Sequence, residues 1–534
     1  MSLNPYNPVW PKTLIFWGAG ATASLEMPIT MRQGKVLTIL GTDESLDQRI
    51  GEAFPFFAKT PKHSQALREL FLGLGDALND QDPLYQEGQR LSQETRFQAL
   101  RKIYDWGTLK QIIQISPKGA DENVTIQDLF NLIDLHRASH HGFLNKGGEP
   151  IPPESLAGAR QALTLILSLL FYEAYQQQLE QPETLRQYYE FAEALTQMMV
   201  EEGLRKENEG KQAIDREFYL FSYAVISMNW DPLLFWMLFN AHKASNERPS
   251  YLEINKRPIP MKLFHDMGHF MGIRKIDGKT PDVRYPLNEA SAQRLNHPDH
   301  VAEYRVRMGK FYFPHGCLNG RECPSCGKWV VHLGDKWDVL SPTLFPSPIL
   351  SQLNKVPREP KSQEEEEAFN QGQSDAVQCA YCGVITQQHH VPFLVQTNFK
   401  HNTPPFLEEI QRDMRVALEK AHHFIFMGYS LPSDDVLYRS LLAARQSRDT
   451  KQKICISIVV GYEPLAPDQW FQDKELEDYF LQNPALPAKK TFDSIQAIFG
   501  KKAKIRSYMK GIPAVFLSQN RADPQKVRTL LESW

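Results

Sequence analysis

The chain has 534 residues, enough for roughly three or four domains of ordinary size. Its 60 Lys and Arg against 63 Asp and Glu give a formal net charge of −3, which argues against a protein devoted to coating nucleic acid or an anionic membrane. A hydrophobic fraction of 42% excludes wholesale disorder, and six Cys in this length exclude a disulfide scaffold. Residues 1–12 lack the features of an export signal, and the longest apolar run, Leu163 to Tyr172, is about half a bilayer span. We therefore expect a cytoplasmic protein without direct membrane binding, and leave nucleic-acid binding open.

Apolar, β-like runs alternate with helical stretches along the chain. The predicted strands lie at 13–17, 221–228, 424–427, 453–460 and, more weakly, 503–508. Helical periodicity marks 71–208 and 406–423, whereas the proline-rich residues 245–310 are predicted to be irregular. Strands that alternate with helices predict an α/β fold with a doubly wound, mostly parallel, Rossmann-like sheet.

The first predicted strand leads directly into a glycine-rich turn, Gly18-Ala19-Gly20-Ala21. Glycines here let the backbone turn tightly, so that amides and a helix N-terminus can face a phosphate. The spacing G-x-G-x-x-A after a strand, with Asp43 about 20 residues further on, fits a dinucleotide-binding turn. Met27 and Pro28 interrupt the helix that such a unit requires, so a purely structural tight turn is the alternative.

Two C-x-x-C pairs predict a structural zinc site. Cys323 and Cys326 form the first pair, Cys379 and Cys382 the second, and four thiolates could close a tetrahedral site. The 52 residues between the pairs exceed the usual gap, and an acidic insert at 357–376, predicted to be a solvated loop, accounts for the excess. Four buried thiols without metal are the alternative, but they would not explain two paired knuckles. Because all four positions are Cys, no coordination position remains open for catalysis.

His315 lies just before the first cysteine pair. Taken alone, a loop histidine is more often a hydrogen-bonded or surface residue than a catalyst. The competing histidines are His140, His141, His265, His269, His422 and His423. His265 and His269 have helical metal spacing but lack a third ligand, and the pair at 422–423 ends a helix, where imidazole complements the dipole. A nucleophilic Cys317 beside His315 is a weaker alternative, and Cys455 is expected to be structural in a buried strand.

Five motifs follow one another along the chain. They are Gly18-Ala-Gly20-Ala-Thr-Ala-Ser24, Asn229-Trp-Asp231, His315-Gly316, the two cysteine pairs, and Gly428-Tyr-Ser430-Leu-Pro-Ser-Asp-Asp435. Each is common alone, but their order, with a zinc ribbon between the histidine and the last motif, is specific. Together they resemble the sirtuin superfamily, and in particular its bacterial NAD-consuming, antiphage-defence branch. The resemblance covers about half of the chain and leaves out the helical stretch.

The resemblance implies a division of the chain and a set of site residues. A sirtuin-type NAD-binding domain would comprise 1–60, 211–310 and 396–534, with a helical insertion at 61–210 and a zinc-ribbon module at 311–395. The implied catalytic residues are the general base His315 with Asn229 and Asp231, which would line the nicotinamide-ribose pocket. The implied cofactor-binding residues are Gly18, Ala19, Gly20, Ala21 and Ser24 at the pyrophosphate turn, and Gly428 and Ser430 at the adenosine half.

Two departures from the family's pattern bear on the reaction and on the binding of adenosine, respectively. Leu25-Glu-Met-Pro-Ile-Thr30 replaces the Pro-Asp-Phe-Arg element that covers nicotinamide in the deacylase branch, and Gly461 stands where an Asn would meet the adenine ribose. The missing cover favours water over an acetyl-lysine carbonyl as the attacking oxygen. We therefore expect an NAD+ hydrolase of antiphage defence, with NAD+ as substrate and Zn2+ as structural metal. A protein-lysine deacylase and a non-catalytic NAD or ADP-ribose sensor are the alternatives.

An unchecked NAD+ hydrolase would be toxic to its host. We therefore expect activity to be held off by a homo-oligomer, by a partner defence protein or by the helical insertion. The sequence shows none of these controls directly, and it identifies no activating trigger.

Overall fold

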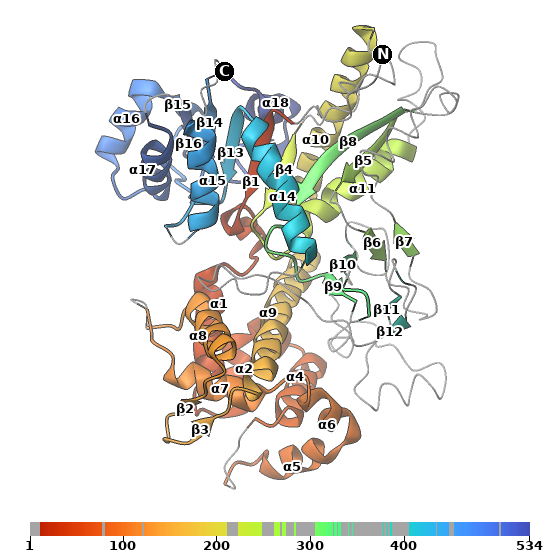
Figure 1. Cartoon of the computed structure of the whole chain (residues 1–534), viewed down its shortest axis with the longest axis vertical. Coiled ribbons are helices and arrows are strands. Elements are labelled where there is room, and N and C mark those ends of the chain that lie inside the picture. The colour runs from red at the N-terminus through yellow and green to blue at the C-terminus, as the bar shows by residue number, and fades with distance from the viewer. Residues whose placement is uncertain are drawn as a thin grey trace.

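The computed structural model describes residues 11–76, 81–119, 122–210, 223–247, 261–266, 270–273, 282–284, 305–323, 325–327, 329–332, 340, 344, 377–378, 382, 385–386, 405–433, 435–447, 453–500 and 503–534. Figure 1 shows an α/β part around one large sheet, a mainly helical part below it, and small sheets to one side. The first of these parts confirms the predicted α/β class.

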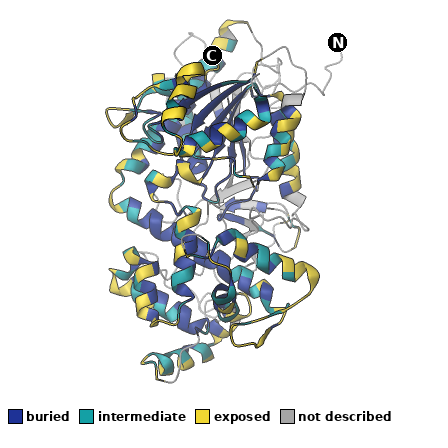
Figure 2. Cartoon of the chain, turned by 90° about the vertical axis from the view of Figure 1, so that its left-hand side faces the viewer, coloured by how far each residue is buried: buried dark blue, intermediate teal, exposed yellow. Residues whose placement is uncertain are grey.

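The large sheet has eight strands in the order β15-β16-β14-β13-β1-β4-β8-β5. Their bounds are β1 (Thr13–Trp17), β4 (Ala224–Ser227), β5 (Met261–Asp266), β8 (Arg305–Tyr312), β13 (His423–Met427), β14 (Cys455–Val459), β15 (Trp470–Gln472) and β16 (Lys504–Tyr508). Every neighbouring pair is parallel except β15 with β16. All residues of β1, β13 and β14 are buried, as expected for parallel strands covered on both faces, and Figure 2 shows this dark-blue interior.

The five predicted strands are confirmed, but the irregular stretch predicted at 245–310 is wrong in part. Strands β5 and β8 lie within it and pair in parallel at one edge of the sheet. Their sequences place charged residues among apolar ones, so neither forms the apolar run by which a buried strand is recognised. The prolines of this stretch flank the two strands and do not interrupt them.

The sheet reverses its order beside β1. From β1 the chain continues to β4 on one side, and it returns past β1 to β13 on the other side. Ligands of doubly wound sheets bind outside the carboxyl ends of the strands at such a point. The carboxyl ends of β1, β4, β8 and β13 lead into the glycine turn, the Asn229 segment, the His315 loop and the Gly428 segment. Four of the predicted motifs therefore lie at one edge of the sheet.

Helices form the lower part of the molecule and cover the sheet above it. The lower helices are α1 (Thr30–Leu40), α2 (Leu46–Ala53), α3 (Pro55–Ala58), α4 (Pro61–Gly73), α5 (Tyr85–Gln93), α6 (Thr95–Arg101), α7 (Trp106–Ile115), α8 (Ile126–Ser139) and α9 (Ser155–Glu180). The helices beside the sheet are α10 (Glu183–Asn208), α11 (Leu233–Glu247), α14 (Pro405–Lys420), α15 (Val436–Ser447), α16 (Asp473–Gln482), α17 (Pro487–Phe499) and α18 (Pro524–Leu531). Helix α10 packs on α11 and α18, and α1 to α3 precede residue 61, so the predicted boundaries of a helical insertion stay a prediction.

Helix α9 reaches from the lower part toward the sheet (Figure 1). In the described part of the chain it alone has the length and apolar composition to cross a membrane, and 72% of its most apolar stretch is buried inside the protein. The core helix of a soluble protein has the same character. The expected buried helix at Leu163 to Tyr172 is confirmed.

Besides the large sheet, the described structure has four small sheets, and the first cysteine pair lies between two strands of the largest of them. Strands β7 (Asp282–Arg284), β6 (Phe270–Ile273), β10 (Trp329–His332) and β9 (Gly320–Glu322) form one of them in that order. Strands β11 (Val377–Gln378) and β12 (Ile385–Thr386) form a separate antiparallel pair. Two further hairpins pair β2 (Phe143–Leu144) with β3 (Pro150–Ile151), and β17 (Leu517–Ser518) with β18 (Arg521–Ala522).

Candidate functional site

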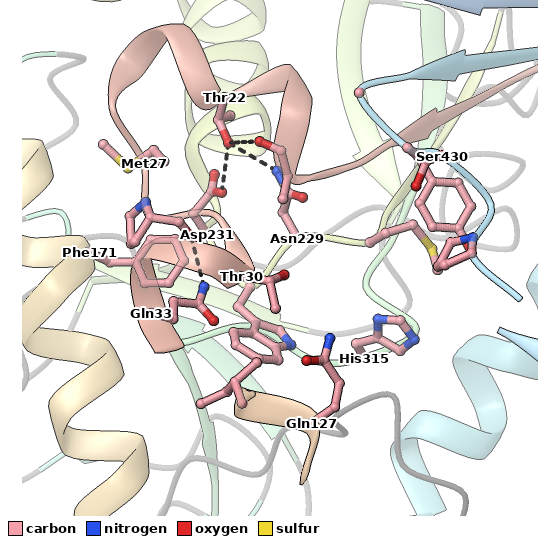
Figure 3. A pocket seen from close by; sticks show the side chains of 18 residues that line it. Thr22, Met27, Thr30, Gln33, Gln127, Phe171, Asn229, Asp231, His315 and Ser430 are labelled. Atoms are coloured by element: carbon pink, nitrogen blue, oxygen red, sulfur yellow. Dashed lines mark hydrogen bonds between the residues drawn. The ribbon is translucent and has the colours of Figure 1, made fainter. Parts of the chain in front are cut away.

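A cavity of about 170 Å³ lies at the carboxyl edge of the sheet (Figure 3). The predicted site residues that line it are Ala19, Asn229, Asp231, His315, Gly428 and Ser430. The lower helices contribute Ile126 and Gln127 from α8 and Phe171 from α9. Segments that are about 400 residues apart in the sequence thus meet around one space.

The glycine turn and the Gly428 segment pack backbone against backbone. The Gly18 amide donates to the Met427 carbonyl at 2.9 Å, and the Gly20 amide donates to the Gly428 carbonyl at 3.0 Å. Gly428 has a φ of 62°, and a Cβ atom there would lie 1.9 Å from the Ala21 nitrogen. The glycines are therefore required by this close approach, and of the turn at 18–21 only Ala19 lines the cavity. This geometry matches the alternative given above, a tight turn whose glycines serve the packing of two backbone segments.

The segment after the turn also differs from a dinucleotide-binding helix. Two short 3-10 turns, Ala19–Ala21 and Ala23–Leu25, precede α1, so the predicted interruption is confirmed. The Ser24 hydroxyl lies 2.6 Å from the Tyr188 hydroxyl, and Ser24 does not line the cavity. Asp43 accepts a hydrogen bond from Gln114 at 3.0 Å, also away from the cavity, and so does not take the ribose position of a dehydrogenase-type site.

Thr22 joins the two side chains of the Asn-x-Asp motif. Its Oγ1 accepts a hydrogen bond from Asn229 Nδ2 at 3.2 Å and lies 3.5 Å from Asp231 Oδ2 (Figure 3). Asp231 Oδ1 accepts from the Leu233 amide at 3.1 Å, which ties the carboxylate to the first residue of α11. Asn229 Oδ1 is buried and has no partner in the described structure. The motif is thus rigidly held, with one acceptor left for a ligand.

Asp231 is a buried carboxyl group in this wall. Burial raises its pKa from 3.8 to about 6, and the hydrogen bonds from the Leu233 amide, Asn229 and Thr22 oppose that shift. The carboxyl is ionised at neutral pH, but only just, because desolvation disfavours the charge. A cation in the cavity would restore part of the lost solvation energy.

His315 sits in the loop after β8 and is 2% exposed. Its Nε2 lies 3.1 Å from the Tyr438 hydroxyl of α15, and the two rings meet edge to face at 5.5 Å. Burial, and then the charge of Asp435, raise the pKa of Tyr438 well above its ordinary value, so its hydroxyl stays protonated. The Leu318 amide donates to the Trp230 carbonyl at 2.8 Å, which fixes the histidine loop against the Asn229 segment.

The competing histidines lie elsewhere where the structure describes them. His140 and His141 are exposed at the end of α8. His423 bonds Ser457 and the Leu531 carbonyl, and burial lowers its pKa to about 3, so it is a neutral core residue. His265 belongs to β5 at the sheet edge, and His269 lies outside the described residues.

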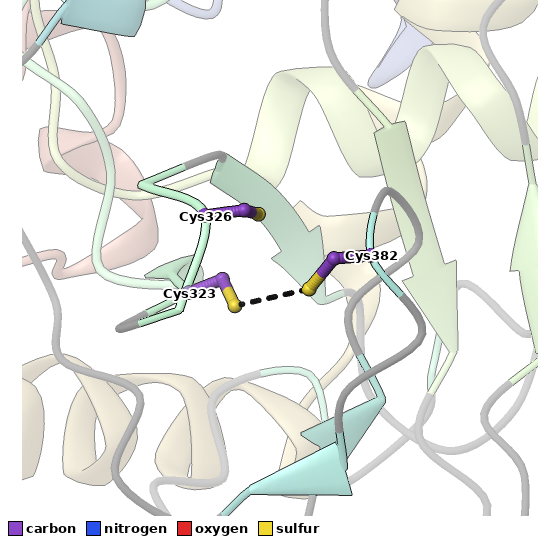
Figure 4. Close-up of side chains that lie close together, drawn as sticks. All are labelled: Cys323, Cys326 and Cys382. Carbon is purple, nitrogen blue, oxygen red and sulfur yellow. Dashed lines mark hydrogen bonds between the residues drawn. The ribbon is translucent and has the colours of Figure 1, made fainter.

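Three cysteines meet beside the small sheets (Figure 4). The sulfurs of Cys323, Cys326 and Cys382 all lie within 4.8 Å of one another, and those of Cys323 and Cys382 are 3.7 Å apart. A disulfide would need about 2.05 Å, whereas two ligands at 2.3 Å from a tetrahedral zinc are about 3.8 Å apart. Cys323 and Cys326 lie between β9 and β10, and Cys382 lies between β11 and β12. Cys379 lies outside the described residues, and the other three fit a tetrahedral metal site.

The two remaining cysteines are placed as expected for structural residues. Cys317 is buried within the His315 loop, and its carbonyl accepts from the Gly320 amide at 3.0 Å. Cys455 lies in β14, and its sulfur faces the Trp534 carbonyl at 3.4 Å. Neither lines the cavity.

Thr22, Gln33 and Tyr438 are among the site residues that sequence reasoning missed. Thr22 lies inside the glycine motif, and its hydroxyl was not considered as a hydrogen-bonding group of the site. Gln33 is a polar residue on the α1 face that otherwise buries Val36, Leu37 and Leu40, and that break in the pattern was its only signal. Tyr438 has no signal in the sequence, because its role depends on the packing of α15 against the His315 loop.

A scan against models of known protein families finds no match to the chain, and a search of curated proteins finds no match either. The sirtuin resemblance therefore stays a hypothesis that depends on the motifs and on the geometry of the cavity.

Proposed function

We propose that this protein hydrolyses NAD+ to ADP-ribose and nicotinamide, as its resemblance to NAD-consuming sirtuin-like proteins implies. The observation that supports this most is the single cavity at the reversal of the strand order. There the Asn-x-Asp motif, His315 and the Gly428 segment face one another. This is the place where doubly wound sheets bind nucleotides.

The residues of the cavity suit the chemistry of the N-glycosidic bond. The bond between the ribose C1′ and the pyridinium nitrogen breaks, its electron pair goes to nicotinamide, and the ribosyl group becomes oxocarbenium-like. The Asp231 carboxylate opposes that positive charge, and Asn229 holds the water or the ribose. The water oxygen bonds C1′, and His315 takes the proton that it loses.

The cysteine cluster would hold a structural zinc. Cys323, Cys326 and Cys382, completed by Cys379, would supply four thiolates and stabilise the fold of the segments around them. The zinc would take no part in the reaction, because its ligand set would be closed.

Regulation would act on access to the cavity. Its volume of about 170 Å³ is below the roughly 300 to 1,000 Å³ of ordinary ligand pockets, so a movement of its walls would help to admit a whole dinucleotide. Those walls come from both the sheet and the lower helices. We place the protein in the bacterial cytoplasm as a defence NAD+ hydrolase, held off until self-assembly or a partner defence protein opens the site.

Mass-spectrometric analysis of NAD+ products after incubation with the purified full chain tests the proposal, with and without phage extract. We expect ADP-ribose and nicotinamide in equal amounts from the wild type and little of either from His315→Ala. Product formation that requires an acetyl-lysine peptide and yields O-acetyl-ADP-ribose would instead establish the deacylase. NAD+ binding without products under any condition would establish the sensor.

A further inference from the structure

Two residues that line the cavity each carry a buried oxygen with no hydrogen-bond partner in the described structure. These oxygens are Oε1 of Gln33 and Oδ1 of Asn229, each on a residue only 4% exposed. Figure 3 shows both side chains at the wall of the cavity. Buried polar atoms are almost always paired in native proteins, so a ligand that brings hydrogen-bond donors into the cavity would supply the missing partners.

Local contacts fix which end of each amide is left over. Gln33 Nε2 donates to the Pro28 carbonyl at 2.7 Å, and Asn229 Nδ2 donates to Thr22 Oγ1 at 3.2 Å. Each amide nitrogen therefore donates within the protein, whereas neither amide oxygen has a partner among the described residues. The two amides present acceptors, and Asp231 adds a carboxylate to the same wall.

A wall of this kind selects the chemistry of its ligand. It favours a group with N–H donors that is neutral or positively charged, and it repels a carboxylate, which offers no donor and carries the same charge as Asp231. The nicotinamide end of NAD+ combines a primary amide with a cationic ring. Phe171 lines the same cavity and offers an aromatic face to that ring.

We infer that Gln33 recognises the carboxamide of the nicotinamide ring, so that the site accepts NAD+ and rejects the dinucleotide whose pyridine carries a carboxylate. The inference rests on the proposed function. It adds a specificity-determining residue from α1, outside the five motifs.

Rates of cleavage of NAD+ and of nicotinic acid adenine dinucleotide test this inference. The wild type should prefer NAD+ by on the order of 10²-fold, because an acceptor left without a donor costs about 1–3 kcal/mol. In Gln33→Met, which keeps the side-chain length but lacks the oxygen, kcat/KM for NAD+ should fall by about 10- to 100-fold, with little change for the nicotinate analogue. Gln65→Met, at an exposed position of α4, should keep the wild-type preference.

The ratio of the two rates separates recognition from structure. Gln33→Met also loses the bond to the Pro28 carbonyl, and a merely structural loss would lower both rates equally and leave the preference unchanged. That outcome, or a wild type that cleaves both dinucleotides equally, would overturn the inference while the hydrolase function stands. If the wild type cleaves neither, the proposed function fails. Calorimetry with free nicotinamide and nicotinate then decides the inference, which an absence of preference for the amide would refute.

Discussion

Replacing Asp231 by Asn should make the protein more stable and less active. The carboxyl is buried, and its pKa of about 6 against 3.8 for an ordinary Asp means that the folded protein holds the proton more tightly than the unfolded chain does. The free energy of unfolding therefore falls as the pH rises from about 4 to 6, and the full cost of the buried charge remains above that range. An Asn carries no charge, and its oxygen can still accept from the Leu233 amide, as Asp231 does.

The size of the effect follows from the shift. From 3.8 to about 6, at 1.36 kcal/mol for each pKa unit, the ionised carboxyl costs about 3 kcal/mol at pH 7. Asp231→Asn should recover up to that amount at pH 7 and almost nothing at pH 4. NAD+ cleavage should fall by roughly 10²- to 10³-fold, because the group that opposes the positive charge is lost. In the wild type, kcat/KM should rise with pH through about 6 as the carboxylate forms.

Denaturant unfolding at pH 4 and pH 7, together with a pH profile of NAD+ cleavage, measures both effects. Asp523→Asn is the matched control, because Asp523 caps α18 through the Gln525 amide away from the cavity, and it should change neither quantity much. A variant at Asp231 that is less stable than the wild type at pH 7 would refute the claim that burial of the charge is costly. A variant that is more stable and fully active would remove Asp231 from the catalytic site.

Three further predictions concern the metal, the base and the close approach of the two glycine segments. Elemental analysis should find about one zinc per chain, and Cys382→Ser should lower both zinc content and folded yield; full occupancy in that variant would exclude a four-sulfur site. His315→Ala should slow NAD+ cleavage by about 10²- to 10⁴-fold at unchanged zinc content, whereas His141→Ala, at an exposed position, should not change the rate. Loss of cleavage in the His141 variant but not in the His315 variant would refute the assignment of the base. Gly428→Ala should destabilise the protein well beyond Gly148→Ala, because both have positive φ but only the first meets backbone, at 1.9 Å; equal unfolding midpoints would contradict that packing.

The strands were predictable where burial on both faces of the sheet requires a continuous apolar run in the sequence. The residues of β1, β13 and β14 are all buried, so each strand is an apolar run that pattern alone can detect. Strands β5 and β8 are the last two strands at one end of the sheet, and they have charged residues among the apolar ones. Because prolines lie close to them in the sequence, this stretch was predicted to be irregular. Pairing between strands, not local sequence, decides such segments.

The site was predictable only as far as its motifs extend. Asn229 and Asp231 follow the end of β4 and His315 follows the end of β8, and the rule that parallel strands share one edge brings them together. The glycines of the turn were predicted for a phosphate, yet their amides bond the Met427 and Gly428 carbonyls. A backbone amide can bond either a phosphate or a neighbouring carbonyl, and the sequence of the turn alone does not show which of the two it bonds.

The lower helices complete the site and do not merely accompany it. Helix α9 contributes Phe171 to the cavity, and two residues later the buried Glu173 accepts from the Phe56 amide at 2.8 Å and from the Phe57 amide at 3.1 Å. The same carboxyl group lies 3.5 Å from the guanidinium of Arg32, the residue before Gln33 on α1. A shift of α9 would therefore move the aromatic wall and disturb α1 at the position of Gln33 together. Both walls depend on one helix that reaches from the lower part to the sheet. Bending of the lower part against the sheet would therefore move the part of the cavity that Gln33 and Phe171 line.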